Sequence, residues 1–190
     1  MLKDLVIKSR SYRKFDENVR IGKDELYRMI DTARYTPSTV NLQALKYKLV
    51  FDRDECEKVF SALRFAGLLK GKGTPPEGMR PAAYIIILCD KTIADDLKFD
   101  SGIAAQTILL SAAEMGYGGC MLGSVDRDSL FEMYGLDKER YIIELVIALG
   151  KPAENIIIED IEQGESTAYY RDENGNHYVP KRKTDDLIIE

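Results

Sequence analysis

The feature that most constrains the fold is an unbroken run of eight apolar residues at positions 82–89, AAYIIILC. The run is too short for a buried helix, and its three consecutive isoleucines favour a β-strand. No charged residue interrupts it, so neither face of such a strand is suited to water. We therefore predict a central strand that is buried on both faces.

A second apolar segment, residues 100–115, predicts the long central helix of the domain. Apolar or small residues occupy nearly every position around the helix, and charges are almost absent between Asp100 and Glu114. Such a helix is buried and closely approached by its neighbours. Gly116 follows it and supplies a C-terminal stop. We predict burial on nearly all sides, within the domain or against a second subunit.

The remaining elements are shorter, and the crossovers between them differ in length. Apolar spacing predicts further helices and strands: helices over 2–8, from about 24 to 35, 54–69 and 126–134, and strands over 46–51 and 141–149. Two helices precede any strand, which favours an α+β fold, with helices on a small mixed sheet, over a regular doubly wound fold. Residues 71–78 and 117–124 are rich in glycine and predict a loop and a return turn.

Length and composition predict one globular domain over residues 1–190. No segment approaches the ~20 apolar residues of a membrane span, and the N-terminus lacks the features of a signal peptide. Cys56, Cys89 and Cys120 are widely spaced, which predicts reduced thiols. We therefore expect a cytoplasmic protein without a membrane partner.

The single histidine and the spacing of the glycines argue against several classes of enzyme. His177 is the only histidine, which argues against a histidine-based metal site and leaves Ser-His-Asp catalysis to one residue in a polar turn. No G-x-G-x-x-G motif follows a predicted strand, so a Rossmann dehydrogenase is disfavoured. We interpret Gly118, Gly119 and Gly123 as a tight turn, and we predict no metal site.

Two basic clusters lie near the two ends of the chain, although the net charge is −5. Residues 9–15 read SRSYRKF and residues 180–183 read PKRK. Guanidinium and hydroxyl groups provide donors that match the geometry of a phosphate. Together the clusters predict one localised anionic ligand; a solvated basic turn is the alternative for either cluster alone. The acidic balance disfavours a nucleic-acid partner.

Four stretches, in the expected order, resemble the nitroreductase family of FMN-dependent flavoproteins. Residues 9–15 resemble its N-terminal Arg-Arg-Ser-x-Arg-x-Phe motif, and residues 37–43, PSTVNLQ, resemble its Pro-Ser-x-x-Asn-x-Gln loop. Residues 100–123 resemble its long helix with a glycine-rich exit, and residues 179–182 resemble its C-terminal phosphate clamp. Ser9 departs from the first arginine of the motif, and Ala44 and Leu45 replace the usual Pro-Trp.

The resemblance implies an FMN site in which the cofactor carries the chemistry, so that no side chain is catalytic. Arg10 and Ser11 would hold the FMN phosphate together with Arg182 or Lys181, and Arg13 would face the ring edge and tune the flavin. The complete set of implied FMN-binding residues is Arg10, Ser11, Arg13, Pro37, Ser38, Asn41, Gln43, Leu122, Gly123, Lys181 and Arg182.

The same resemblance implies an FMN-dependent oxidoreductase that takes a hydride from NAD(P)H. The acceptor would be a flat, electron-poor small molecule such as a nitroaromatic or a quinone. It also implies a homodimer with FMN at the interface, and an extended C-terminal arm after about residue 151 that embraces the second subunit. A non-catalytic flavin-binding or flavin-sensing protein of the same fold is the alternative.

Overall fold

A computed structural model describes residues 1–65, 67–69, 73–94 and 99–189. Its main sheet is built around β3 (Ala83–Asp90), which pairs with β2 (Leu45–Val50) on one side and β5 (Tyr141–Pro152) on the other. β5 is long enough to pair also with β4 (Gly118–Leu122) and β1 (Phe15–Asp16). All of these pairs are antiparallel. The prediction of a mixed sheet is therefore wrong for the main sheet.

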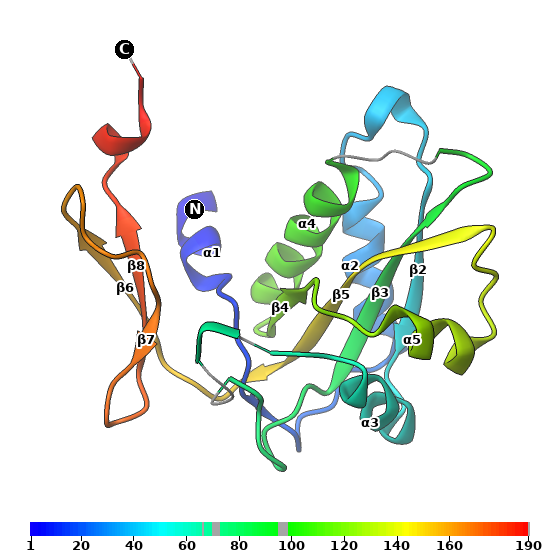
Figure 1. The fold of residues 1–190 in the computed structure, drawn as a ribbon, viewed down its shortest axis with the longest axis horizontal. Coiled ribbons are helices and arrows are strands. Elements are labelled where there is room, and N and C mark those ends of the chain that lie inside the picture. The colour runs from blue at the N-terminus through cyan, green and yellow to red at the C-terminus, as the bar shows by residue number, and fades with distance from the viewer. Residues whose placement is uncertain (66, 70–72, 95–98, 190) are drawn as a thin grey trace.

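Helices cover both faces of the main sheet and give the molecule three layers (Figure 1). α2 (Lys23–Ala33) and α4 (Asp100–Glu114) pack on one face. α3 (Arg53–Ser61) and α5 (Arg127–Tyr134) pack on the other. Helices and sheets together confirm the predicted α+β class.

The side chains of β3 alternate between the two apolar layers, as the period of a strand requires. Ile85 and Ile87 lie in the cluster formed with α2 and α4, and Tyr84, Ile86 and Leu88 lie in the cluster formed with α3 and α5. All eight residues of the strand are buried. The predicted central strand, buried on both faces, is confirmed.

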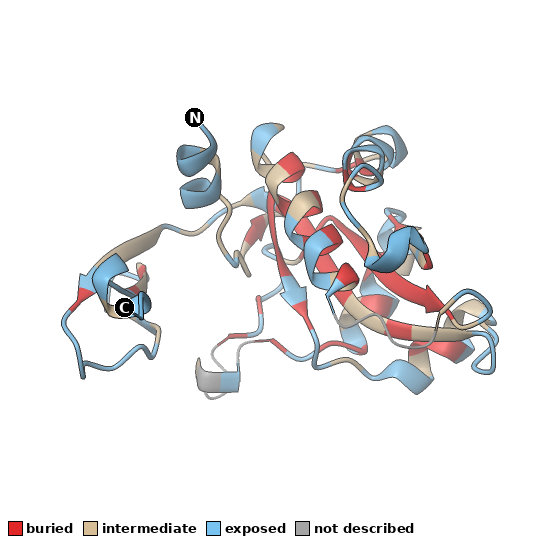
Figure 2. Ribbon diagram, turned by 90° about the horizontal axis from the view of Figure 1, so that it is seen from above, coloured by how far each residue is buried: buried red, intermediate tan, exposed pale blue. Residues whose placement is uncertain are grey.

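The helix α4 is buried on one face only in the single chain (Figure 2). Ala105, Ile108 and Ala112 pack against the sheet and α2, whereas Gln106 is exposed and Ile103 is 38% exposed. Burial on nearly all sides is therefore not confirmed, because the described elements leave Gln106 and much of Ile103 uncovered, although α1 contacts α4. The predicted stop at Gly116 is confirmed by its φ of 80°, which favours glycine.

The predicted helix over 54–69 is too long, since α3 ends at Ser61. The chain leaves the helix there to make backbone contacts with the segment after β4. Leu63 forms an isolated β-bridge with Val125, and the Arg64 N–H donates to the Ser124 carbonyl at 3.1 Å. These long-range contacts, which local propensity does not encode, compete with the last helical turns.

The predicted turn at 117–124 is instead the strand β4, and the tight-turn interpretation of its glycines is wrong. A Cβ on Gly119 would lie 2.2 Å from the Ala148 carbonyl oxygen, and a Cβ on Gly118 would lie 2.5 Å from the Tyr12 ring. These positions need glycine because neighbouring chain segments approach the strand closely.

Residues after β5 form a small separate sheet of β6 (Ile156–Ile161), β7 (Tyr170–Arg171) and β8 (His177–Arg182). β6 and β8 are parallel, and β7 and β8 are antiparallel. We call this unit the C-terminal sheet. Figure 1 shows it beside α1 (Leu2–Lys8), away from α3 and α5. The predicted arm thus contains a folded sheet, and its embrace of a second subunit stays a prediction.

Short 3₁₀ turns complete the fold: η1 (Thr39–Asn41), η2 (Gly67–Leu69) and η3 (Thr184–Leu187). Within the described ranges, none of the helices has the length and apolar character that crossing a bilayer would require.

Candidate functional site

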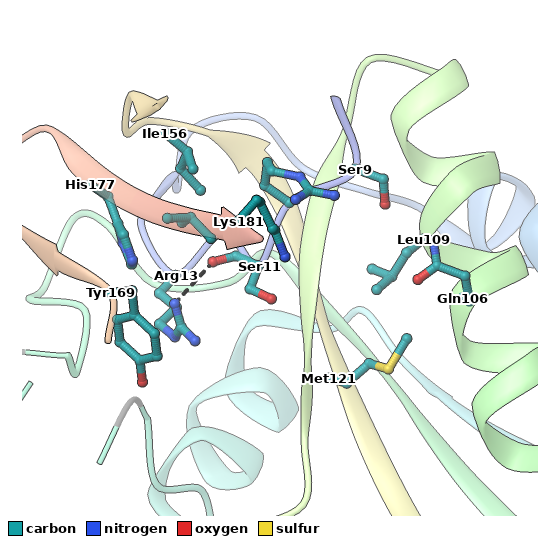
Figure 3. A pocket seen from close by; sticks show the side chains of 12 residues that line it. Ser9, Ser11, Arg13, Gln106, Leu109, Met121, Ile156, Tyr169, His177 and Lys181 are labelled. Atoms are coloured by element: carbon teal, nitrogen blue, oxygen red, sulfur yellow. Dashed lines mark hydrogen bonds between the residues drawn. The ribbon is translucent and has the colours of Figure 1, made fainter. Parts of the chain in front are cut away.

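A cavity of about 350 Å³ lies where the N-terminal motif, β4, α4 and the C-terminal sheet meet (Figure 3). We call it the basic pocket. Its lining residues are Ser9, Arg10, Ser11, Arg13, Gln106, Leu109, Met121, Ile156, Tyr169, His177, Val179 and Lys181. The two basic clusters, about 170 residues apart in the sequence, therefore contribute to one cavity.

The N-terminal motif reaches the pocket because its backbone lies against β4. Ser11 forms a parallel β-bridge with Gly119, and the Tyr12 N–H donates to the Gly119 carbonyl at 3.1 Å. In this extended segment, Ser11 and Arg13 line the pocket, whereas Tyr12 packs against Gly118. The closely approached glycines of β4 thus set the position of the motif.

The C-terminal cluster contributes through alternate residues of β8. His177, Val179 and Lys181 line the basic pocket, as residues two apart on one strand face do. Arg182 is exposed and does not line the pocket. The structure therefore brings Lys181, rather than Arg182, to Arg10, Ser11 and Arg13.

The pocket contains cationic donors whose hydrogen-bonding capacity is incompletely used. The Arg10 Nη2 donates to the Val6 carbonyl at 2.8 Å, and the Arg13 Nη1 donates to the Ser11 carbonyl at 3.1 Å. The Nε atoms of both arginines are buried and have no hydrogen-bond partner among the described residues. A buried donor without a partner costs about 1–3 kcal/mol. An oxyanion in the pocket would satisfy such donors with charge-assisted hydrogen bonds.

A buried carboxylate, Glu154, lies directly behind the motif. Its Oε1 accepts hydrogen bonds from the backbone N–H groups of Arg13 at 2.5 Å and Lys14 at 3.1 Å. Its Oε2 lies 2.7 Å from the Arg171 Nη2 and 3.8 Å from the His177 Nδ1. Burial raises the pKa of Glu154, but His177, the Arg13 N–H and the Arg171 charge outweigh this effect and lower the pKa to about 2.

The sequence analysis missed Glu154 and placed His177 in a polar turn. The structure places His177 at the start of β8, where it is 1% exposed. The alternation of β8 could have identified His177, because it lies four residues before Lys181 and so shares its strand face. No local signal marks Glu154, since its backbone donors Arg13 and Lys14 are 141 and 140 residues away.

The predicted loop 37–43 lies elsewhere, at the N-terminal end of α4 (Figure 1). Pro37, Ser38 and Gln43 line a second cavity of about 160 Å³, which we call the loop cavity. The buried Asp100 fixes the loop, since its carboxylate accepts from the Thr39 N–H at 3.0 Å and the Thr39 hydroxyl at 2.7 Å.

The backbone of this loop is strained. Val40, Asn41 and Gln43 have φ values of 49°, 58° and 53°, which non-glycine residues rarely adopt. The Gln43 amide donates to the Asn41 carbonyl at 3.3 Å, and the Gln43 N–H donates to the Ser38 hydroxyl at 3.2 Å. Strain of this kind persists where surrounding contacts hold it, and it is concentrated at functional sites.

The predicted Leu122 and Gly123 lie in neither cavity. Leu122 is buried in the apolar cluster with α3 and α5, and Gly123 is exposed. Their neighbour Met121 lines the basic pocket instead, because successive side chains of β4 point to opposite faces. The basic pocket and the loop cavity share no lining residue in the described chain, so one copy does not bring the full predicted set together.

The three-layer fold and the basic pocket together define a class of protein. Comparison with known proteins identifies this class. The family model described as "Nitroreductase family" matches residues 7–151, more than half of the chain. The protein belongs to the nitroreductase family, as its four motif stretches predicted.

Three individual relatives are each less than 30% identical to this chain. The chain is 29% identical over 188 residues to the CLA biosynthesis enone reductase of Lactiplantibacillus plantarum, covering 80% of this chain and 86% of that protein. A solved structure of an FMN-dependent nitroreductase from Clostridium difficile R20291 is 26% identical, with a TM-score of 0.62, and covers 80% of this chain and 87% of that one. A solved structure of a Desulfovibrio desulfuricans protein in complex with FMN covers 100% of this chain and 95% of that one, at 19% identity and a TM-score of 0.71.

Proposed function

We propose that this protein is an FMN-dependent oxidoreductase that uses NAD(P)H to reduce a flat, electron-poor small molecule such as a nitroaromatic or a quinone. The observation that carries the proposal is the meeting of Arg10, Ser11, Arg13 and Lys181 in one cavity with buried, unsatisfied arginine donors. Family membership and the FMN bound to a protein of similar fold support it.

The residues of the basic pocket suit FMN in both charge and shape. Arg10, the Ser11 hydroxyl and Lys181 would hold the phosphate, because they combine cationic and neutral donors at one end of the cavity. Leu109 and Met121 supply apolar side chains on the α4 side, where a flat ring can be kept from water (Figure 3). FMN, when bound, supplies the hydride transfer from the nicotinamide to the acceptor.

The proposal includes a homodimer. The strained loop of one copy lies away from its own basic pocket, and the outer face of α4 is uncovered. A second copy packed on this face would cover α4 and bring its loop to the pocket. We expect a dimer in light scattering of the purified protein, and a monomer that retains FMN would contradict this arrangement.

The decisive experiment is spectroscopic. The purified protein should show a flavin spectrum after incubation with FMN, and NADH or NADPH should bleach it in the absence of air. Addition of a quinone or a nitroaromatic should restore the oxidised spectrum. Bound FMN that neither nicotinamide bleaches would favour the flavin-binding or flavin-sensing alternative. Failure to bind FMN would reject the proposed cofactor.

A further inference from the structure

The segment that joins β5 to the C-terminal sheet connects both chain ends to the basic pocket. The Ala153 N–H donates to the Lys14 carbonyl at 2.9 Å, and the His177 N–H donates to the Asn155 carbonyl at 2.9 Å. Glu154 lies between these two contacts, and its side chain is 2% exposed. The segment therefore touches the N-terminal motif on one side and the start of β8 on the other.

The side chain of Glu154 makes the contacts that join the N-terminal motif to the C-terminal sheet. One carboxylate oxygen accepts the backbone N–H groups of Arg13 and Lys14. The other lies 2.7 Å from the Arg171 Nη2 on β7, and 3.8 Å from the His177 Nδ1 on β8. A single buried group thus fixes the motif that supplies Arg13 and the sheet that supplies Lys181.

The charge of Glu154 has the wrong sign for an anion pocket. A carboxylate behind the N-terminal motif repels a phosphate in the basic pocket, and burial strengthens this repulsion because the local dielectric is low. If Glu154 acted only through its charge, neutralising it would strengthen the binding of a phosphate. If Glu154 acts through its contacts, replacing it with glutamine would weaken that binding, because an amide has a single acceptor oxygen and cannot serve both the backbone N–H groups and Arg171.

We infer that Glu154 is a positioning residue that locks the C-terminal sheet onto the N-terminal motif and so sets the phosphate end of the basic pocket. This inference deepens the proposed function and rests on it. Glu154 itself does not line the basic pocket. It acts by holding the backbone of Arg13 and the side chain of Arg171, and thereby keeps Lys181 opposite Arg10.

The test is the binding of FMN and of riboflavin, which lacks the phosphate, to the full-length protein freed of cofactor. In Glu154→Gln we expect FMN to bind about ten- to a hundredfold more weakly, in line with the loss of the charge-assisted contact to Arg171. Riboflavin affinity should change by less than about twofold. Tighter or unchanged FMN binding overturns the inference, and so does an equal loss for both flavins, which indicates a merely structural role.

A matched control is Asp90→Asn. Asp90 is also a buried carboxylate with an arginine partner, since the Arg140 Nη2 lies 2.9 Å from its Oδ2, but it lies at the end of β3 and does not line the pocket. We expect this variant to bind both flavins as the wild type does. A phosphate-selective loss here equal to that in Glu154→Gln overturns the assignment to Glu154.

A second variant keeps the inference testable if Glu154→Gln does not fold. Glu154→Asp retains the charge but shortens the side chain by one methylene, so positioning predicts weaker FMN binding with little change for riboflavin. Unchanged FMN affinity in Glu154→Asp overturns the inference.

Hydrogen exchange separates this inference from the proposed cofactor. In the cofactor-free chain, the amides of Arg13 and Lys14 should exchange faster in Glu154→Ala, which removes their acceptor, than in the wild type, while the amides of β3 stay protected. Unchanged exchange at both amides overturns the positioning role. Failure of the wild type to bind FMN rejects the proposed function but leaves this measurement interpretable.

Discussion

The three-layer core and the C-terminal sheet are held in place by different kinds of contact. The core contains two apolar clusters, one on each face of the main sheet. The C-terminal sheet lies outside both clusters and is joined to the N-terminal motif by polar contacts centred on Glu154. This difference teaches that apolar substitutions in the core should change stability and leave ligand binding unchanged, whereas substitutions at the polar contacts should change ligand binding.

The largest expected effect is on the stability of the core. Ile86→Ala removes a fully buried side chain from β3, and such a deletion costs about 2–5 kcal/mol because it leaves a cavity. The free energy of unfolding in urea measures the loss. The matched control is Ile158→Ala in β6, where the side chain is only half-buried and we expect a clearly smaller loss. Equal losses would show that burial of apolar side chains stabilises the core and the C-terminal sheet to the same extent.

The next effect is the pH dependence contributed by Glu154. Its pKa of about 2 lies below the ordinary value of 4.5, so its stabilisation is complete above about pH 4.5 and is lost as the pH falls towards 2. The shift corresponds to about 3 kcal/mol. The free energy of unfolding of Glu154→Gln should therefore lie below that of the wild type at pH 7 and approach it at pH 3. A difference that does not change with pH would contradict the shift.

A third effect concerns binding and leaves the core unchanged. Lys181→Met should weaken FMN binding by about 1.5–3 kcal/mol, since it removes a charge-assisted contact to the phosphate. Arg182→Met is the control, because Arg182 does not line the pocket. Calorimetric titration with FMN compares the two variants. If Arg182→Met weakens FMN binding more than Lys181→Met does, the resemblance to the phosphate clamp identifies the residue that contacts the phosphate, and the strand alternation does not.

The smallest expected effect is on the redox potential. If Arg13 faces the flavin ring edge, Arg13→Met removes a hydrogen bond that strengthens on reduction by about 1–2 kcal/mol. For a two-electron couple this lowers the midpoint potential by roughly 20–40 mV. A spectroelectrochemical titration measures the change. An unchanged potential with weaker FMN binding would instead place Arg13 at the phosphate, beside Arg10 and Lys181 in the basic pocket.

The sequence by itself determined the elements whose signals are local. The apolar run at 82–89 specified a strand with two covered faces, and the spacing of apolar residues located α2, α4 and α5 to within a few residues. The motif stretches determined the family, because their residue types and order do not depend on how the elements pack.

Only the tertiary structure decided which of these residues meet. Gly118 and Gly119 read locally as a turn, but they form a strand because Tyr12 and the Ala148 carbonyl approach where a Cβ would lie. The position of β8 against β6 places the strand face that carries Lys181, and not the face that carries Arg182, at the basic pocket. Glu154 joins groups that are far apart in the chain, and contacts of that kind arise only when the elements have packed.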